Sequence, residues 1–236
     1  MTRNKFIGVL DIYIFAKKTY MRLNRLFSTF LMQAIWYWTP EVRIGKDVRF
    51  YGVPIIDVVQ SASLTIDENV TISSSSIGYH TNMHSPVKLV ADRPGARIHI
   101  GAKTRIHGTC VHAQKSITIG KHCLIAANCE IFDSSAHDLI LADPLDRIST
   151  DGSVSPIVIE DAVWIGANCI ILPGSSIGFG SVVAAGSVVR GSYSSNSLIA
   201  GNPARFVRSL IDSEQELAKS MCFGREDAGL PQQSTQ

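Results

Sequence analysis

The chain has 236 residues, of which 45% are hydrophobic and only 18% are charged, and its formal net charge is +2 at pH 7. This composition excludes a disordered or collagen-like chain, and the length allows one sizeable core with an appendage. The 27 isoleucines and 18 valines favour β-strands over a helical bundle.

The positive charge is concentrated at the start of the chain. Residues 1–40 carry six Lys or Arg residues and a single Asp, a net charge of +5, so the rest of the chain sums to −3. A basic arm of this kind indicates contact with something anionic. The body has no basic excess, so we expect no nucleic-acid partner.

The first predicted element is a basic amphipathic helical segment over residues 1–41. Apolar residues recur at helical spacing from Ile7 to Trp38, and Pro40 ends the pattern. Two interpretations stay open. The segment packs against the domain or a sister subunit, or it lies on a membrane surface with its aromatic residues at headgroup depth.

The sequence predicts a cytoplasmic protein that is at most peripheral at the inner face of the membrane. No apolar run reaches the length of a transmembrane helix, and Asp11 breaks the only stretch that resembles a signal peptide. The cysteines are odd in number and form no CxxC pair, which favours reduced thiols over disulfides. They are Cys110, Cys123, Cys129, Cys169 and Cys222.

From about residue 42 the chain repeats with a period of six. The clearest run of aliphatic residues comprises Ile159, Ile165, Ile171, Ile177, Val183 and Val189. This period matches neither an α-helix nor a long flat strand. It fits a three-sided coil with one inward aliphatic on each side and about 18 residues in each turn. We therefore expect an all-β solenoid over residues 42–203.

Two polar excursions interrupt the repeat, near residues 78–97 and 133–156. Both contain histidine and proline, and long excursions from a stiff scaffold are a usual place for function. The open ends of the solenoid need caps. We expect the N-terminal segment at one end, and at the other a short C-terminal helix that begins near Ala204 within a helix-and-tail segment, residues 204–236.

Three motifs carry a family resemblance. In order they are CLIAANCEIFDSSAHD at residues 123–138, VWIGANCIILPG at 163–174 and IAGNPARFVR at 199–208. Together with the repeat, they resemble the hexapeptide-repeat O-acetyltransferases, the bacterial relatives of maltose and galactoside acetyltransferases, and especially those that act on surface polysaccharides. The resemblance covers about residues 42–210. It implies a left-handed parallel β-helix, a homotrimer, and acetyl-CoA as co-substrate between neighbouring coils, with no metal.

His137 is the candidate catalytic base. Acyl transfer from a thioester to a sugar hydroxyl requires removal of the hydroxyl proton, which a neutral imidazole can accept near pH 7. In the family, the histidine of this motif has that role. Asp133, four residues earlier, is expected either to orient the imidazole or bind the acceptor, or to cap a local turn.

The candidate donor site follows the C-terminal coils. In the family, the VWIG stretch lines the coenzyme A groove, and small side chains let an extended ligand approach the backbone. The resemblance also assigns basic residues to the phosphates of coenzyme A, and guanidinium groups suit this role. At one of these positions relatives often carry lysine where this chain has Arg190. The candidate residues are Trp164, Gly166, Ala167, Ala185, Arg190, Arg205 and Arg208.

Two alternative functions stay open. Left-handed β-helices include zinc-dependent γ-carbonic anhydrases, and the spacing of His107 and His112 is similar to part of their ligand set. The second alternative is a non-catalytic scaffold protein with the same fold, for which substitution of His137 would have no effect on function. For the acetyltransferase, we expect a sugar acceptor in a surface polysaccharide or a lipid-linked glycan precursor; a formyl or succinyl donor also stays open.

Overall fold

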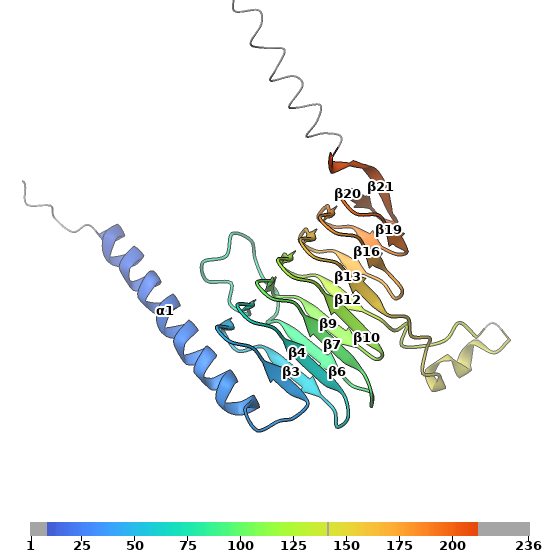
Figure 1. The fold of residues 1–236 in the computed structure, drawn as a ribbon, viewed down its shortest axis with the longest axis horizontal. Coiled ribbons are helices and arrows are strands. Elements are labelled where there is room, and N and C mark those ends of the chain that lie inside the picture. The colour runs from blue at the N-terminus through green and yellow to red at the C-terminus, as the bar shows by residue number, and fades with distance from the viewer. Residues whose placement is uncertain (1–8, 141, 212–236) are drawn as a thin grey trace, which may run out of the picture.

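The fold is a parallel β-helix with one long helix at its N-terminal end (Figure 1). The structure is a computed structural model that describes residues 9–140 and 142–211. Successive short strands belong to three different sheets in turn, so each coil contributes one strand to each sheet. The six-residue repeat therefore forms the predicted three-sided coil.

The three sheets run the length of the solenoid. The first sheet contains β1 (Val42–Ile44), β4 (Ser63–Ile66), β7 (Arg97–Ile100), β10 (Ser116–Ile119), β13 (Ile157–Ile159), β16 (Ser176–Ile177) and β19 (Ser192–Tyr193). The second contains β2 (Arg49–Tyr51), β5 (Thr71–Ser73), β8 (Arg105–His107), β11 (Leu124–Ile125), β14 (Trp164–Ile165), β17 (Val182–Val183), β20 (Ser197–Gly201) and β21 (Ala204–Ser209). The third contains β3 (Ile55–Val58), β6 (Lys88–Ala91), β9 (Cys110–Ala113), β12 (Glu130–Phe132), β15 (Ile170–Ile171) and β18 (Val188–Val189).

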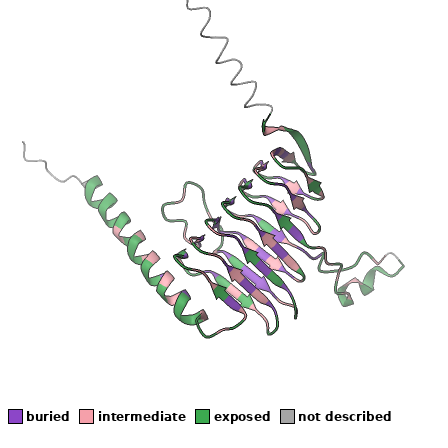
Figure 2. Ribbon diagram, in the orientation of Figure 1, coloured by how far each residue is buried: buried purple, intermediate pink, exposed green. Residues whose placement is uncertain are grey.

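The core is a ladder of aliphatic side chains along the axis of the coil. On the first sheet the paired positions Ile66, Ile100, Ile119, Ile159 and Ile177 are at most 1% exposed. Figure 2 shows the buried residues gathered on the strands, with exposed residues on the helix and the excursions. This ladder explains the excess of isoleucine and valine in the chain, because β-branched side chains pack well on a pleated surface.

Helix α1 (Val9–Trp36) covers the open end of the first coil. Its residues Ser28 and Met32 are buried, and Met32 joins the hydrophobic core. The Thr29 hydroxyl accepts a hydrogen bond of 3.0 Å from the backbone N–H of Phe50 in β2. The helix thus shields core side chains and pairs a backbone donor of the terminal coil.

The C-terminal cap differs from the expectation. Residues Ala204–Ser209, where we expected a helix to begin, form strand β21, which pairs antiparallel with β20. The chain reverses at Gly201–Pro203, and β21 then satisfies the free edge of the last strand of the second sheet. The helical prediction is wrong for these six residues, and residues 212–236 lie outside the described part of the chain.

The two excursions leave the solenoid at different corners. The first, residues 74–87, joins β5 to β6 and is shorter than the expected 78–97, because residues 88–91 already form a regular strand. The second, residues 133–156, joins β12 to β13 and contains a 3-10 helix, η1 (Pro144–Ser149). Figure 1 shows the first beside α1 and the second projecting away from α1.

Substitution of one inward aliphatic should destabilise the protein far more than substitution of an outward one. Ile106 is fully buried, whereas Val158 is 40% exposed. We expect Ile106→Ala to lower the free energy of unfolding by ~2–5 kcal/mol through lost burial and a residual cavity. Val158→Ala should change it by less than ~0.5 kcal/mol. Denaturant unfolding followed by circular dichroism tests this, and equal losses for both variants would contradict the ladder.

Candidate active site

A row of outward side chains crosses the second sheet from one end of the solenoid to the other. Strand register places one residue of each coil in this row: Arg49, Thr71, Arg105, Leu124, Trp164, Val182, Leu198 and Arg208. Both ends of the row are cationic and its middle is apolar. Trp164 is 52% exposed and Leu124 43% exposed, which is unusual for adjacent large apolar side chains.

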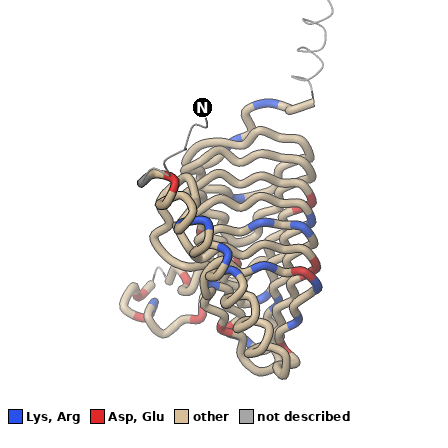
Figure 3. Tube along the Cα trace, turned by 90° about the vertical axis from the view of Figure 1, so that its left-hand side faces the viewer, with Lys and Arg blue, Asp and Glu red and all other residues tan. Residues whose placement is uncertain are grey.

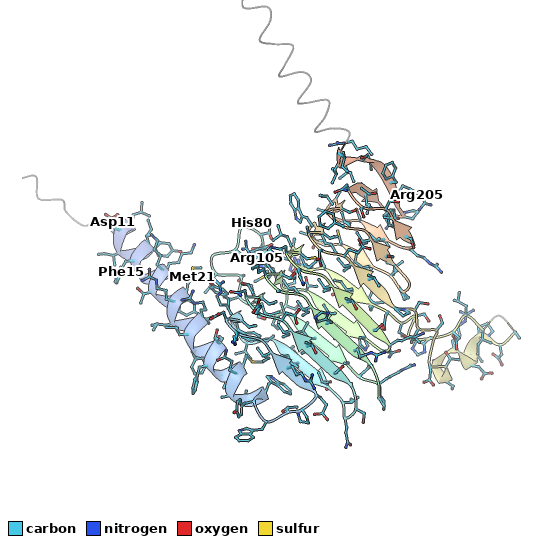
Figure 4. The ribbon with its side chains drawn as sticks, in the orientation of Figure 1. Asp11, Phe15, Met21, His80, Arg105 and Arg205 are labelled. Atoms are coloured by element: carbon cyan, nitrogen blue, oxygen red, sulfur yellow. The ribbon has the colours of Figure 1, made fainter. Side chains whose placement is uncertain are left out.

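The middle of this row opens into a cavity of about 710 Å³, here called the tryptophan cavity. The coils supply four of the predicted donor residues to its lining, Trp164, Gly166, Ala167 and Ala185. Loop 74–87 and β8 supply polar residues, among them His80 and Arg105, which Figure 4 shows next to one another. The structure therefore brings the small residues and the tryptophan together on one wall.

Gly166 has a structural reason to be glycine. A Cβ at this position would lie 2.6 Å from the backbone nitrogen of Ala185 in the next coil. Coil stacking alone therefore excludes a side chain here, whatever approaches from outside. Ala167 and Ala185 line the tryptophan cavity with side chains of a single methyl group, so a ligand can approach the backbone there.

His137 lies on the second excursion and its side chain is exposed. Its Nδ1 is 3.0 Å from the carbonyl oxygen of Arg147. A carbonyl oxygen can only accept, so Nδ1 carries the proton and donates it, and Nε2 of the neutral ring keeps its lone pair. The Thr150 hydroxyl donates to the same carbonyl at 2.8 Å. The excursion thus fixes the tautomer that a general base requires.

A second cavity, of about 410 Å³, surrounds His137 and is here called the histidine cavity. Arg190 lines it, together with Ser153 and Pro173. Arg190, predicted to contact the donor with Arg205 and Arg208, therefore lies beside the catalytic candidate, and the other two arginines do not line this cavity. The histidine cavity and the tryptophan cavity share no lining residue, so a single chain does not place His137 beside Trp164.

Asp133 does not contact His137. Its side chain is fully buried, and the carboxylate accepts three backbone hydrogen bonds of 2.7–2.8 Å, from Gln114, Lys115 and Ser116. These donors belong to the turn between β9 and β10. Of the roles left open for Asp133, the structure supports the turn-capping one, and the predicted catalytic role is wrong. The reason is that the short turn leaves three N–H groups that converge on one carboxylate.

Arg205 and Arg208 lie on β21 at the C-terminal end of the solenoid. Arg208 pairs with Leu198 and continues the outward row, and Arg205 pairs with Ala200. Figure 4 shows Arg205 at the C-terminal end of the solenoid. Both arginines are exposed. Within the described residues, the ion pairs join only histidines to aspartates, so no carboxylate engages these guanidinium groups. Strand β21, which forms where a helix was expected, thus presents two guanidinium groups without a carboxylate partner.

Sequence reasoning singled out His107 but did not group it with Tyr79 and Arg105. The ring of Tyr79 stacks on that of His107 with centroids 4.4 Å apart. Burial, and then the nearby positive groups of Arg105 and His80, lower the pKa of His107 to about 4. His107 is therefore neutral at pH 7. One available signal was position, because from Thr71 to Leu198 each residue of the outward row directly precedes an inward aliphatic, as Arg105 precedes Ile106.

The histidines of the zinc alternative do not converge. His107 lies on the second sheet and His112 on the third, where its Nε2 is 2.7 Å from Asp92 Oδ2. In the part of the chain that the structure describes, no three His, Cys, Asp or Glu side chains are placed to hold a metal ion. This arrangement does not support the anhydrase interpretation.

The cysteines have no nucleophilic role in this geometry. The four described cysteines are free thiols, and three of them are buried in the coil. Burial, reinforced by the charge of Glu130, raises the pKa of Cys110 to about 11, so this thiol stays protonated at pH 7. Cys222 lies outside the described residues.

Comparison with known proteins identifies the relatives of this chain. Residues 156–191 match the family "Bacterial transferase hexapeptide (six repeats)". The putative lipopolysaccharide biosynthesis O-acetyl transferase WbbJ of Escherichia coli K12 is 34% identical over 143 residues, which cover 58% of this chain and 73% of WbbJ. The chain belongs to the hexapeptide-repeat acetyltransferases. This acetyltransferase also spans about half the length of a putative acetyltransferase from Schizosaccharomyces pombe, with 33% identity.

Two solved structures share the fold of this acetyltransferase. A hexapeptide-repeat acetyltransferase from Vibrio cholerae, complexed with acetyl coenzyme A, aligns with a TM-score of 0.50 and 25% identity over 86% of this chain and 90% of its own. A mutant of AntD, an N-acyltransferase from Bacillus cereus, aligns with a TM-score of 0.59 and 20% identity over 80% of this chain and 96% of its own. The β-helix is thus left-handed, as predicted. The protein is an acyltransferase, so the interpretation as a non-catalytic scaffold is wrong.

Removal of the Asp133 carboxylate should act on stability. We expect Asp133→Ala to lower the free energy of unfolding by about 2–3 kcal/mol, because three backbone N–H groups lose a charged acceptor. Asp138→Ala, an exposed change in the same excursion, should cost less than ~0.5 kcal/mol. Thermal unfolding of the two variants provides the measurement. Equal stability of Asp133→Ala and the unmodified protein would contradict the capping role.

Proposed function

We propose that this protein transfers an acetyl group from acetyl-CoA to a hydroxyl of a sugar, as a homotrimer with His137 as general base. The observation that carries the proposal is the hydrogen bond from His137 Nδ1 to the Arg147 carbonyl, which in the neutral tautomer makes Nε2 the nitrogen that accepts a proton. We further propose a surface polysaccharide or lipid-linked glycan precursor as the acceptor. The name of the relative WbbJ, a lipopolysaccharide biosynthesis O-acetyl transferase, supports that choice.

The reaction is a direct transfer. His137 Nε2 takes the proton from the acceptor hydroxyl as its oxygen attacks the thioester carbonyl. The carbon–sulfur bond then breaks, and the imidazolium returns the proton to the thiolate, which gives an acetyl ester and a free thiol. The Arg147 carbonyl holds the ring and stabilises its charged form. A base of this kind contributes about 10²–10⁴-fold to the rate.

The outward row supports an extended donor on the second sheet. Its apolar middle, from Leu124 to Leu198, suits the pantetheine arm, whose phosphates would then lie at Arg208 and Arg205. Guanidinium groups bind phosphate through paired, charge-assisted hydrogen bonds. Trp164 and Arg208 are three strand spacings apart, roughly 14 Å at ~4.8 Å per strand.

A homotrimer would complete the site. Within one chain His137 and Trp164 line separate cavities, so a neighbouring chain must bring a second histidine cavity to each tryptophan cavity. A closed ring of head-to-tail contacts does this three times with one kind of interface. The exposure of Trp164 and Leu124 agrees with a surface that a partner covers.

Mixed trimers test both the base and the shared site. We expect His137→Ala to lower acetyl transfer at least a hundredfold with coenzyme A binding retained, and Trp164→Ala to weaken donor use. Co-expression of the two variants should restore about a quarter of the activity, since random assembly leaves that share of interfaces with both residues intact. His122→Asn, an exposed histidine at another corner, is the control. Full activity of His137→Ala would exclude the base, and absence of complementation would exclude the shared site.

We also propose that α1 rests on an anionic bilayer at the cytoplasmic face. Its surface away from the solenoid carries apolar side chains at helical spacing, among them Phe15, Leu23 and Phe30, each more than 60% exposed. Lys17, Lys18 and Arg22 are exposed on the same helix. Figure 3 shows basic positions in blue along the helix. Tyr37 and Trp38 follow, 76% and 85% exposed. Apolar, aromatic and cationic side chains on one helix match an anionic headgroup layer. None of the described helices is long and apolar enough to span a bilayer.

Vesicle sedimentation tests this placement. We expect the protein to sediment with phosphatidylglycerol vesicles, and Lys18→Glu with Arg22→Glu to weaken binding at least about tenfold. Arg97→Glu with Lys121→Glu, two exposed cations of the solenoid, provides a control of equal charge change. If the protein does not sediment with vesicles and instead forms larger oligomers through α1, a second copy of the chain covers this face and the proposal is wrong.

A further inference from the structure

A third cavity lies on the second sheet at the N-terminal end of the outward row. It measures about 600 Å³, and it is formed by the first three coils, loop 74–87 and α1. The Met21 side chain of α1 packs so closely on Gly78 of the loop that a Cβ at Gly78 would overlap it. Figure 4 shows Met21 on the side of α1 that faces the loop. Three separate segments of the chain therefore build this space.

The charge of this cavity is one-sided. Arg49, Lys103 and Arg105 line it, and none of its lining residues is acidic. Among the described residues, ion pairs join only histidine to aspartate, so these three cations have no carboxylate partner. Hydroxyl groups, including that of Tyr51, line the rest of the cavity. We call this space, defined by Arg49, Lys103 and Arg105, the arginine cavity; its chemistry suits an anion that carries hydroxyl groups.

A buried imidazole lies where this cavity meets the tryptophan cavity. His107 is 8% exposed, and its Nδ1 is enclosed by the protein without a hydrogen-bond partner. His107 lines both the arginine cavity and the tryptophan cavity, as do Tyr79 and Arg105. A ligand whose anionic group is held by Arg105 therefore lies next to this imidazole and extends toward Trp164.

The position of the arginine cavity separates it from the donor. Arg105 and Trp164 are two strand spacings apart, about 10 Å, on the side of Trp164 opposite to Arg208. A donor with its phosphates at Arg208 and its thioester near Trp164 therefore leaves the N-terminal side of the row for the acceptor. The hydroxyl to be acetylated lies between the two ends.

We propose that the arginine cavity binds an anionic group of the acceptor, a phosphate, diphosphate or carboxylate, and so selects acidic or phosphate-bearing sugars. Arg49, Lys103 and Arg105 hold the charge, the bound group lies beside His107, and the reacting hydroxyl faces Trp164. This inference rests on the proposed acetyl transfer and specifies the acceptor class for that site.

Binding of inorganic pyrophosphate tests the cavity without any acetyl transfer. We expect saturable binding by calorimetry, weakened at least tenfold in Arg105→Gln and in Lys103→Gln, and partly regained in Arg105→Lys. Lys121→Gln, an exposed cation at another corner, should bind as the unmodified protein does. Coenzyme A affinity should be unchanged in Lys103→Gln and Lys121→Gln, because neither residue lines the tryptophan cavity. Absence of pyrophosphate binding in the unmodified protein overturns the proposal, and so does a larger loss for coenzyme A than for pyrophosphate in Arg105→Gln.

Kinetics with matched acceptors identify the source of the anion. A nucleoside diphosphate sugar, a lipid diphosphate sugar and a carboxylated sugar are compared with the corresponding neutral sugar. We expect Lys103→Gln to raise KM for the preferred anionic acceptor at least tenfold and leave the KM for acetyl-CoA unchanged, because Lys103 does not line the tryptophan cavity. Equal use of the neutral sugar would overturn the anionic specificity while leaving acetyl transfer intact. Loss of transfer with every acceptor, despite pyrophosphate binding, would instead count against the proposed function.

Discussion

Stacking of one inward aliphatic per strand is the constraint on which the rest of the structure depends. Once Ile106, Ile125 and Ile165 lie above one another, the residues that precede them are forced outward in a single row. The charge and polarity of the side chains in this row then vary only along the axis of the solenoid. A solenoid of this kind converts linear order in the sequence into linear order on a surface, which suits two extended substrates that meet end to end.

The repeat could be predicted because its signal is local. Each hexapeptide needs only an aliphatic residue at one position, and Ile159 through Val189 display that period without reference to any distant segment. The candidate base was also accessible, since His137 occurs in a long excursion from a regular scaffold. In both cases the chemistry that identifies the residue lies within a few positions of it.

The errors concern partners that are distant in the sequence. Asp133 caps a turn whose donors lie 17–19 residues earlier, and spacing to His137 carried no information about that turn. The segment from Ala204 forms a strand because the last coil has a free edge, a property of the whole stack and not of residues 204–209. The position of Arg190 beside His137 likewise depends on how the coils stack, and the residues around Arg190 in the sequence do not indicate it.

The distribution of charge now has a spatial meaning. The near-neutral total conceals cations at both ends of one outward row, Arg208 at the C-terminal edge and Arg49 with Arg105 at the other, separated by an apolar stretch around Trp164. A single negatively charged donor needs only one of these ends. Because α1 forms one wall of the arginine cavity and also carries the basic, apolar outer face, an acceptor with an anionic group at a membrane surface would meet both features together.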